Sequence, residues 1–540
     1  MSRVLRIATG GIALVAGCGD LPPSPSLQPL FRSTAPAISS ADDRLQQRLR
    51  IRNMADSVLV RRVQEHGNIV VVGIKPEQEL LGVGSRGENL VPPGELRARY
   101  YAVRALASRV LHEFRSIPAI AVQLREANSV VALRRMPWVD YVIANSRDMT
   151  PDALVDNCVN PLSNAQTIGW AVARINADDA WATATGTNGA LLILDDGLDV
   201  SLAQNPDTEL PWWAYYSFQG QTSSSDDGSH GTLTFSVAGA RNNSIGIVGS
   251  APAAEMHYGD ILPGGFNLQW QNAAALIIDT TAPNTRVVSI SYSSKETSEP
   301  PGFAALHDAI ISAYYQRSIL FVASTGNQGN ASWVAYPAAY DEVIGVGGSN
   351  SADEYALNNY GGASVEVAAP AVDVPVVCKG AGTTGVESGT SFATPLVAGG
   401  MMLMRQHFPT HSNDQLRTHL RETAVPMAEP QKSGAGRVDI LAALAPIVTS
   451  PPGPPSVSIV GNTEIQALLS CQWAAVVRNG TAPFTYSWTV NGLPAGDGSE
   501  SLWYENDGNP FTIAVTVTDS DGRITSDGHE VAIASGMGCA

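Results

Sequence analysis

Four polar residues stand where strands are predicted to end or helices to begin, and together their types could break an acyl bond. Asp195 follows an apolar run, His230 stands in a Ser-His-Gly-Thr motif, and Ser391 stands in Ser-Gly-Thr-Ser-Phe-Ala-Thr-Pro. Asn327 ends a Ser-Thr-Gly-Asn motif. A serine hydroxyl becomes nucleophilic when an imidazole takes its proton, and a carboxylate fixes the tautomer of that imidazole. A side-chain amide can stabilise the developing oxyanion. The residues therefore predict acyl transfer through a serine.

The stretch that carries these motifs predicts a doubly wound α/β domain over residues 160–448. Its apolar runs are typical of strands buried on both faces, as at 191–194, 287–290 and 319–323. Helical stretches separate the runs, which indicates a parallel sheet. Binding crevices of open parallel sheets lie at the carboxyl ends of the strands, where Asp195 would stand.

Two smaller units are expected on either side. Residues 61–145 predict a small α/β unit with strands at 69–72, 120–124 and 139–142 and with helices at 96–114 and 130–135. A Pro-rich linker, 449–456, precedes residues 457–540. In that last segment apolar and polar residues alternate over 511–518, which predicts a β-sandwich.

The first residues are typical of an export signal. Residues 1–18 contain Arg3 and Arg6, then a short apolar stretch, and end in Val-Ala-Gly-Cys. This tetrapeptide resembles a bacterial lipobox, which would lipidate Cys18; the alternative is an ordinary signal peptide with an incidental cysteine. Residues 19–60 begin rich in Pro and Ser and predict a tether. We expect an exported protein, either a cell-envelope lipoprotein or a secreted one.

The cysteines agree with export. The chain has five cysteines, so lipidation of Cys18 would leave four. Four cysteines allow three pairings, and we favour Cys471 with Cys539 because they share the last segment, which leaves Cys158 with Cys378.

Charge is distributed unevenly along the chain. The net charge is −17, with +7 over residues 1–150 and −24 over the rest. The acidic body argues against nucleic-acid binding. The opposite signs predict that the two parts attract each other, although a merely solvated surface would look the same. We expect a monomer whose membrane contact, if any, is the lipid.

The four motifs together resemble the subtilisin-like serine protease family, in the chain order Asp, His, Ser of subtilisin. The resemblance runs from Gln166 to about residue 444. It implies a serine endopeptidase in which Asp195, His230 and Ser391 form the triad and Asn327 completes the oxyanion hole. Asp196 and Leu396 depart from most subtilisins and look kexin-like, but dibasic specificity is not carried over.

The resemblance also implies binding residues. Substrate would pair as an added strand with the segment Ser291, Tyr292 and Ser293, and would meet Ser324, Thr325 and Gly326. Core packing is the alternative role for Tyr292. A structural Ca²⁺ would be held by Gln166, Asp207, Arg241, Asn243, Ile245 and Ile247, through side-chain oxygens or backbone carbonyls. An Asn-rich turn without metal is the alternative.

The flanking units carry resemblances too. Residues 61–145 resemble the subtilisin propeptide, which implies a zymogen, an intramolecular inhibitor and a self-made cut between about residues 144 and 166. Residues 457–540 resemble PKD or immunoglobulin-like modules. Two other classes stay open. A serine esterase would usually show Gly-x-Ser-x-Gly, whereas Ala393 takes the last place. A catalytically weak or inactive binding or adhesion protein would be expected to have a broken triad.

Overall fold

The computed structural model describes most of the chain in segments. These are residues 47–48, 51, 54–75, 93–151, 166–198, 215–216, 229–261, 268, 270–294, 296, 298–327, 329, 334–356, 361–362, 364–378, 384–447, 455–460, 464–465, 467, 470–478, 484–496, 498–499 and 501–533. The export signal with Cys18, the Ca²⁺ candidate Asp207, and Cys158 and Cys539 lie outside these residues. Within them, no helix is both long enough and apolar enough to cross a membrane.

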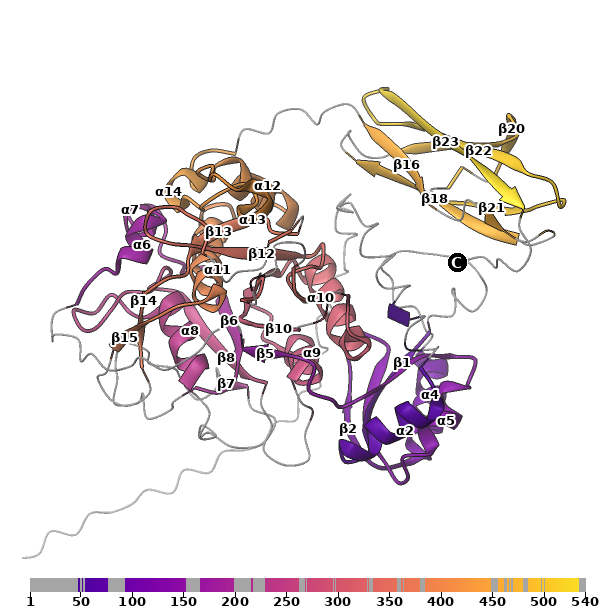
Figure 1. Cartoon of the computed structure of the whole chain (residues 1–540), viewed down its shortest axis with the longest axis horizontal. Helices are drawn as coiled ribbons and strands as arrows, with labels where there is room; N and C mark the ends of the chain where they lie inside the picture. The colour runs from indigo at the N-terminus through magenta and orange to yellow at the C-terminus, as the bar shows by residue number, and fades with distance from the viewer. Residues whose placement is uncertain are drawn as a thin grey trace, which may run out of the picture. The chain divides into compact units, whose positions relative to one another are not determined.

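The first unit is one antiparallel sheet with helices against it (Figure 1). The strands lie in the order β2-β3-β1-β4, and the elements are α2 (Asp56–Glu65), β1 (Ile69–Ile74), α4 (Pro93–Arg104), β2 (Ala107–Glu113), β3 (Ala119–Leu124), α5 (Ser129–Arg134) and β4 (Val139–Ala144). Alternate residues of a strand face opposite sides of the sheet. Val70 and Val72 accordingly pack with Leu59 of α2, whereas Val71 belongs to the core cluster of the large domain.

Two expectations for this unit are wrong. The helix predicted over 96–114 ends at Arg104, and residues 107–113 form strand β2. The apolar spacing there also fits an edge strand, because burial along β2 is slight and its pairing with β3 decides the conformation. In addition, the tether expected to reach residue 60 ends earlier, since α2 begins at Asp56 and buries Leu59 and Val63.

The large domain is built on a seven-stranded sheet in the order β13-β12-β11-β9-β6-β8-β7, in which every pair is parallel. This confirms the predicted α/β fold, and the three strands expected from apolar runs are β6, β9 and β11. The strands are β6 (Ala190–Asp195), β7 (Tyr215–Tyr216), β8 (Glu255–Asp260), β9 (Thr285–Ile290), β11 (Leu320–Ser324), β12 (Val343–Ser349) and β13 (Val367–Pro370).

Helices pack against this sheet in two pairs, α8 with α11 and α9 with α10 (Figure 1). The central helix α11 contacts β6, β9, β11, β12 and β13 and is buried almost throughout. The helices are α6 (Trp170–Arg174), α7 (Ala177–Ala180), α8 (Ser229–Gly239), α9 (Trp270–Thr280), η3 (Pro301–Phe303), α10 (Ala304–Arg317), α11 (Thr390–His407), α12 (Asn413–Glu422), α13 (Pro430–Ser433) and α14 (Ile440–Ala443). Two small ladders join β14 (Val374–Val377) to β15 (Thr384–Glu387), and β5 (Thr150–Pro151) to β10 (Tyr292–Ser293).

The last unit has two sheets that share one hydrophobic core. Their orders are β16-β18-β21 and β17-β23-β22-β19-β20. Trp473 of one sheet and Trp488 of the other are both buried in that core. The strands are β16 (Ser456–Val460), β17 (Glu464–Ile465), β18 (Ser470–Arg478), β19 (Thr485–Val490), β20 (Leu493–Ala495), β21 (Ser501–Glu505), β22 (Phe511–Thr518) and β23 (Ile524–Ile533).

Candidate active site

The carboxylate and the imidazole predicted to work together are in direct contact. Asp195 ends β6, and His230 is the second residue of α8. The Nδ1 atom of His230 lies 2.7 Å from Oδ1 of Asp195, and both side chains are buried. The other oxygen of Asp195 accepts a hydrogen bond of 2.8 Å from the hydroxyl of Thr234. A carboxylate held from both sides in this way fixes the orientation of the ring.

Close backbone packing brings α8 to the end of β6. A Cβ atom on Gly231, next to His230, would lie 1.8 Å from the hydroxyl oxygen of Tyr258 and 2.3 Å from the carbonyl oxygen of Gly197. Only glycine fits there, so the glycine after the histidine is a packing requirement.

Ser391 is the second residue of α11, at the amino end of the central helix. Gly389, just before the helix, has a φ of 149°, a backbone conformation that residues with a side chain rarely adopt. The hydroxyl of Ser391 donates to the carbonyl oxygen of Ser291 at 3.3 Å, and the hydroxyl of Ser291 donates to the carbonyl oxygen of Ser391 at 2.9 Å. The ring of Phe392, the next residue, lies 6.1 Å from the ring of His230, centre to centre. The serine and the histidine therefore share one site.

The side-chain amide nitrogen of Asn327 is available to hydrogen-bond a ligand at this site. Its Oδ1 atom accepts hydrogen bonds from the backbone N–H of Thr390 at 3.0 Å and from the hydroxyl of Thr390 at 3.1 Å. These two bonds point its Nδ2 atom away from Thr390, and among the described residues Nδ2 is buried without a hydrogen-bond partner. A buried donor without a partner is costly unless a ligand satisfies it. Next to Ser391, the N–H groups of Asn327 suit an oxyanion.

A second carboxylate, Asp196, stands beside the pair. It accepts the backbone N–H of Gly231 at 2.9 Å, and burial together with the negative charge of Asp195 raises its pKa to about 7. Its carboxylate lies within 4.8 Å of ligand atoms of Asp195 and His230. The sequence marked Asp196 only as a departure from most subtilisins; the pair of adjacent acids at a strand end was the available signal.

The segment expected to pair with substrate is strand β10. The ring of Tyr292 is buried, perpendicular to the ring of His230 at 5.4 Å and tilted against Trp270 at 5.4 Å. Tyr292 thus packs against the imidazole of the candidate site. Thr325 and Ser324 are buried at the carboxyl end of β11, and Gly326 adopts φ of 100° directly before Asn327. The structure brings these residues to the same edge of the sheet as Asn327.

Five of the six expected Ca²⁺ ligands also come together. The carboxamide nitrogen of Gln166 faces four oxygens: the carbonyls of Arg241 at 2.6 Å, Ile245 at 2.9 Å and Ile247 at 3.2 Å, and Oδ1 of Asn243 at 3.4 Å. A half-turn of the carboxamide would add its own oxygen to the cluster. An all-oxygen set of this kind fits a hard cation such as Ca²⁺.

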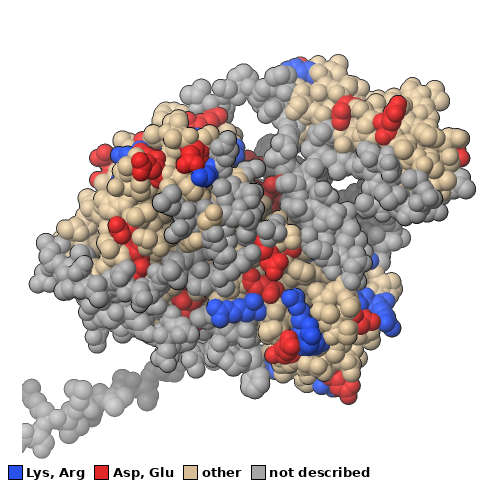
Figure 2. Space-filling view, viewed as in Figure 1, with Lys and Arg blue, Asp and Glu red and all other residues tan. Residues whose placement is uncertain are grey.

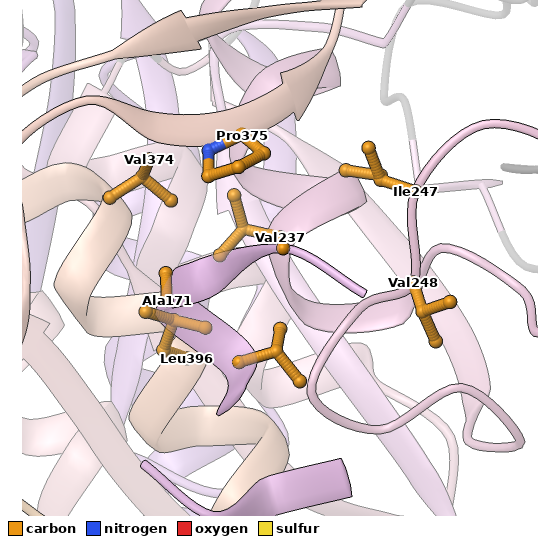
Figure 3. Close-up of a pocket in the computed structure, with 9 residues that line it drawn as sticks. Ala171, Val237, Ile247, Val248, Val374, Pro375 and Leu396 are labelled. Carbon is orange, nitrogen blue, oxygen red and sulfur yellow. The ribbon is translucent and has the colours of Figure 1, made fainter. Parts of the chain in front are cut away.

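The loop that carries these oxygens rests on a small apolar pocket (Figure 3). Ile247 and Val248 of the loop face Val237 of α8 and Leu396 of α11 across it. The remaining lining comes from Gly169, Ala171, Val172, Val374 and Pro375. The lining is apolar, so the loop packs against the domain core through hydrophobic contacts around this pocket.

Comparison with known proteins agrees with this geometry. The subtilase family model matches residues 188–441. The chain is 31% identical over 335 residues to an alkaline protease of Shouchella clausii, covering 62% of this chain and 81% of that protein. It is 33% identical over 281 residues to subtilisin BL of Lederbergia lenta, covering 52% of this chain and 99% of that protein. The chain belongs to the subtilase family.

This subtilase is a serine-type endopeptidase with an α/β catalytic fold. It is also 31% identical over 323 residues to the minor extracellular protease Epr of Bacillus subtilis strain 168, covering 58% of this chain and 47% of Epr.

Proposed function

We propose that Ser391 is the nucleophile, His230 the general base and Asp195 the residue that orients His230. The hydroxyl of Ser391 attacks the scissile carbonyl while His230 takes its proton, and His230 then gives the proton to the leaving amine. Asn327 and the backbone N–H of Ser391 bind the oxyanion. The contact of 2.7 Å between Asp195 and His230, in one site with Ser391, carries this proposal.

Casein hydrolysis tests this function. We expect hydrolysis by the wild type and its loss after treatment with a serine-directed reagent. An intact protein without peptidase activity would favour the binding or adhesion protein, and cleavage of esters without casein would favour an esterase.

The protein would be made as a zymogen, with residues 61–145 of the first unit acting as its inhibitor. The support is the set of contacts that this unit makes with the large domain. Asp279 of α9 accepts the backbone N–H groups of Arg115 at 2.9 Å and Ser116 at 2.7 Å. Arg48, which precedes the unit, bridges it to the large domain, because it pairs with Asp140 of β4 at 2.9 Å and with Asp308 of α10 at 2.8 Å. Among these contacts, the pair of Arg48 with Asp308 joins opposite charges of the front part and the acidic body.

The charges on the surface are more mixed than the net values. Figure 2 shows Lys and Arg side chains gathered over the unit of residues 54–144, with several Asp and Glu side chains among them. Direct contacts such as those of Asp279 therefore support docking better than net charge does.

Self-processing would release this inhibitor. Ser391→Ala should accumulate as an unprocessed precursor, whereas the wild type should be shortened. Immunoblots in a host without other extracellular proteases test this, and equal shortening of both proteins would assign the cut to another enzyme.

Export and lipidation at Cys18 complete the proposal. Their support is the sequence of residues 1–18 and the likeness to Epr, whose name describes it as extracellular. Cys18→Ser should move the protein from the membrane fraction to the soluble one, because acyl chains anchor by burying methylene groups. A wild type already soluble with Cys18 intact would end the lipobox proposal.

Two structural roles belong to the proposal as well. A Ca²⁺ held by Gln166, Arg241, Asn243, Ile245 and Ile247, with Asp207 as the expected sixth ligand, would tie residue 166 to the loop. Disulfides would join Cys158 to Cys378 and Cys471 to Cys539; Cys378 and Cys471 are buried, and the other two cysteines lie outside the described residues. The last unit, with its two sheets, would be a PKD or immunoglobulin-like accessory module.

A further inference from the structure

A cluster of buried ionisable side chains lies outside the catalytic site. Its centre is His307 of α10, whose side chain is fully buried. Nδ1 of His307 lies 3.1 Å from Oε1 of Glu299, and Nε2 lies 3.6 Å from Oε2 of Glu342. Both glutamates are buried as well. The imidazole therefore stands between two buried acids that come from different segments of the chain.

The two acids keep this imidazole protonated. Burial alone would lower the pKa of His307, but the carboxylates of Glu299 and Glu342 outweigh it and raise the pKa to about 9. A buried ion pair that loses one partner leaves an uncompensated charge in the interior, which is strongly destabilising. At neutral pH the cluster is thus an imidazolium between two carboxylates, and the cation balances charges that would otherwise repel each other.

Further ionisable groups face this cluster. The phenol ring of Tyr340 stacks on the imidazole, with ring centres 3.7 Å apart, and its hydroxyl donates to Oε1 of Glu299 at 2.6 Å. The hydroxyl of Tyr315, also on α10, lies 3.5 Å from Oε1 of Glu342. The positive charge of Arg48 acts on Glu299, but Arg48 would leave with the first unit after self-processing. The imidazolium is then the cation that faces both carboxylates.

The loop of residues 334–342 runs from this cluster to the catalytic site. The backbone N–H of Ala335 donates to the carbonyl oxygen of Thr325 at 3.2 Å. The carbonyl oxygen of Tyr336 accepts the backbone N–H of Ser294 at 2.8 Å. Thr325 belongs to one segment that is expected to meet substrate, and Ser294 directly follows the other. The loop therefore joins the two segments to each other.

The other end of this loop is held in the cluster through Tyr340 and Glu342. The rings of Tyr336 and Tyr340 lie 5.1 Å apart, centre to centre, so packed side chains connect the cluster to the part of the loop that contacts both segments. We propose that His307 is a positioning residue for substrate binding, whose imidazolium fixes this loop and, through it, the spacing of the two segments. The inference rests on the proposed peptidase mechanism and on the substrate contacts expected of these segments.

A charge-balance series tests this role by steady-state kinetics on a peptide substrate. His307→Gln leaves two buried carboxylates without their cation, so KM should rise at least ~10-fold while kcat stays within ~3-fold of the wild type. The double variant His307→Gln/Glu342→Gln removes one acid as well and should bring KM back toward the wild-type value. Equal rises in KM for the single and double variants, or no rise in either, would overturn the inference.

His257→Gln is the matched control for this series. His257 is also a buried imidazole paired with a glutamate, since its Nε2 lies 2.8 Å from Oε1 of Glu255, but it lies on β8, which pairs with β6 and β7. Its KM should match that of the wild type. A rise in KM as large as that of His307→Gln would show that any buried imidazole has this effect, which contradicts a specific role for His307.

The wild type gives a second test that does not depend on how a variant folds. The contribution of the imidazolium is complete below its ordinary pKa of 6.5 and is lost as the pH rises through about 9. KM for a capped peptide without ionisable groups should therefore rise from about pH 8 to about pH 10. The double variant should keep KM constant over this range. A constant KM in the wild type, or an equal rise in both proteins, would overturn the role of His307.

Labelling of Ser391 with a phosphonofluoridate separates this inference from the proposed mechanism. The label should reach Ser391 in the wild type and in His307→Gln alike, because the substitution leaves Ser391 and His230 unchanged. A wild type that is not labelled would overturn the proposed mechanism. Normal labelling of both proteins, with the same KM, would overturn the role of His307 and leave the mechanism intact.

Discussion

Oδ1 of Asp279 lies 2.7 Å from the backbone nitrogen of Ser116, although the two residues are 163 positions apart. Asp279 also accepts the N–H of Arg115 and the hydroxyl of Ser116, and lies 3.2 Å from Nε2 of His112. Burial alone would raise the pKa of Asp279, but the hydrogen bonds from His112, Ser116 and Arg115 outweigh it and lower the pKa below its usual value. The first unit is thus tied to the ionised form of one carboxylate on α9.

Replacing this carboxylate should weaken the inhibitor. Asp279→Ala removes the acceptor of the backbone N–H groups of Arg115 and Ser116, and each lost hydrogen bond to a charged group costs about 1.5–3 kcal/mol. We expect activity to appear at least ~10-fold faster after processing of the full chain, measured with a chromogenic peptide. Glu422→Gln, at an exposed acid at the end of α12, is the control and should match the wild type. Equal activation rates for wild type and Asp279→Ala would show that this contact does not hold the unit.

Asn327→Ala should impair the chemical step more than binding. Removal of one oxyanion donor of the matching type in subtilisin lowers kcat by about 10²–10³. Steady-state kinetics on a peptide substrate should show a loss of this size in kcat with KM nearly unchanged. An unchanged kcat would mean that Nδ2 of Asn327 does not meet the oxyanion.

Asp196 should make stability depend on pH. Its pKa is about 7 in the folded protein, raised by burial and by Asp195, and near 3.9 when unfolded. Between these pH values the folded state holds a proton that the unfolded state has lost, so this group lowers the free energy of unfolding as the pH rises from about 4 to about 7.

Thermal melts of Asp196→Ser against wild type from pH 4 to pH 8 check this, with both chains carrying Ser391→Ala to prevent self-digestion. The melting temperature of Asp196→Ser minus that of its parent should increase up to about pH 7 and stay constant above that pH. A constant difference across the range would contradict the raised pKa.

Chelation should lower the melting temperature, because an ion bound only by the folded state stabilises it by mass action. Saturating EDTA is expected to lower it for the wild type and to have little effect on Asn243→Ala, which lacks one oxygen of the cluster. Added Ca²⁺ should restore the wild type. An equal response to EDTA in both proteins would place any stabilising ion elsewhere.

Sequence patterns predicted those parts of the protein that depend on local spacing. The apolar runs that became β6, β9 and β11 are buried on both faces and need no partner to be recognised. The apolar spacing over residues 96–114 predicted a single helix, and this was wrong beyond Arg104 because edge strand β2 is defined by its pairing with β3. The contact of Asp279 with Ser116 and the pairing of β5 with β10 join distant segments, and no local pattern encodes either one.

The features of the site also divide into those that a local sequence motif indicates and those that arise only from the fold. The proximity of Asp195, His230, Ser391 and Asn327 could be expected, because each stands in a short motif at or just beyond the end of a strand or at the start of a helix. The raised pKa of Asp196 could not, since it arises from burial and from the neighbouring charge of Asp195 after folding.

Covalent labelling tests the central claim that Ser391 is the nucleophile of an endopeptidase. A phosphonofluoridate should add once per active molecule, with the adduct mapped to Ser391 by peptide mass spectrometry, and casein hydrolysis should fall in proportion to labelling. Stoichiometric labelling at another serine, or full hydrolysis of casein with Ser391 modified, would contradict the account.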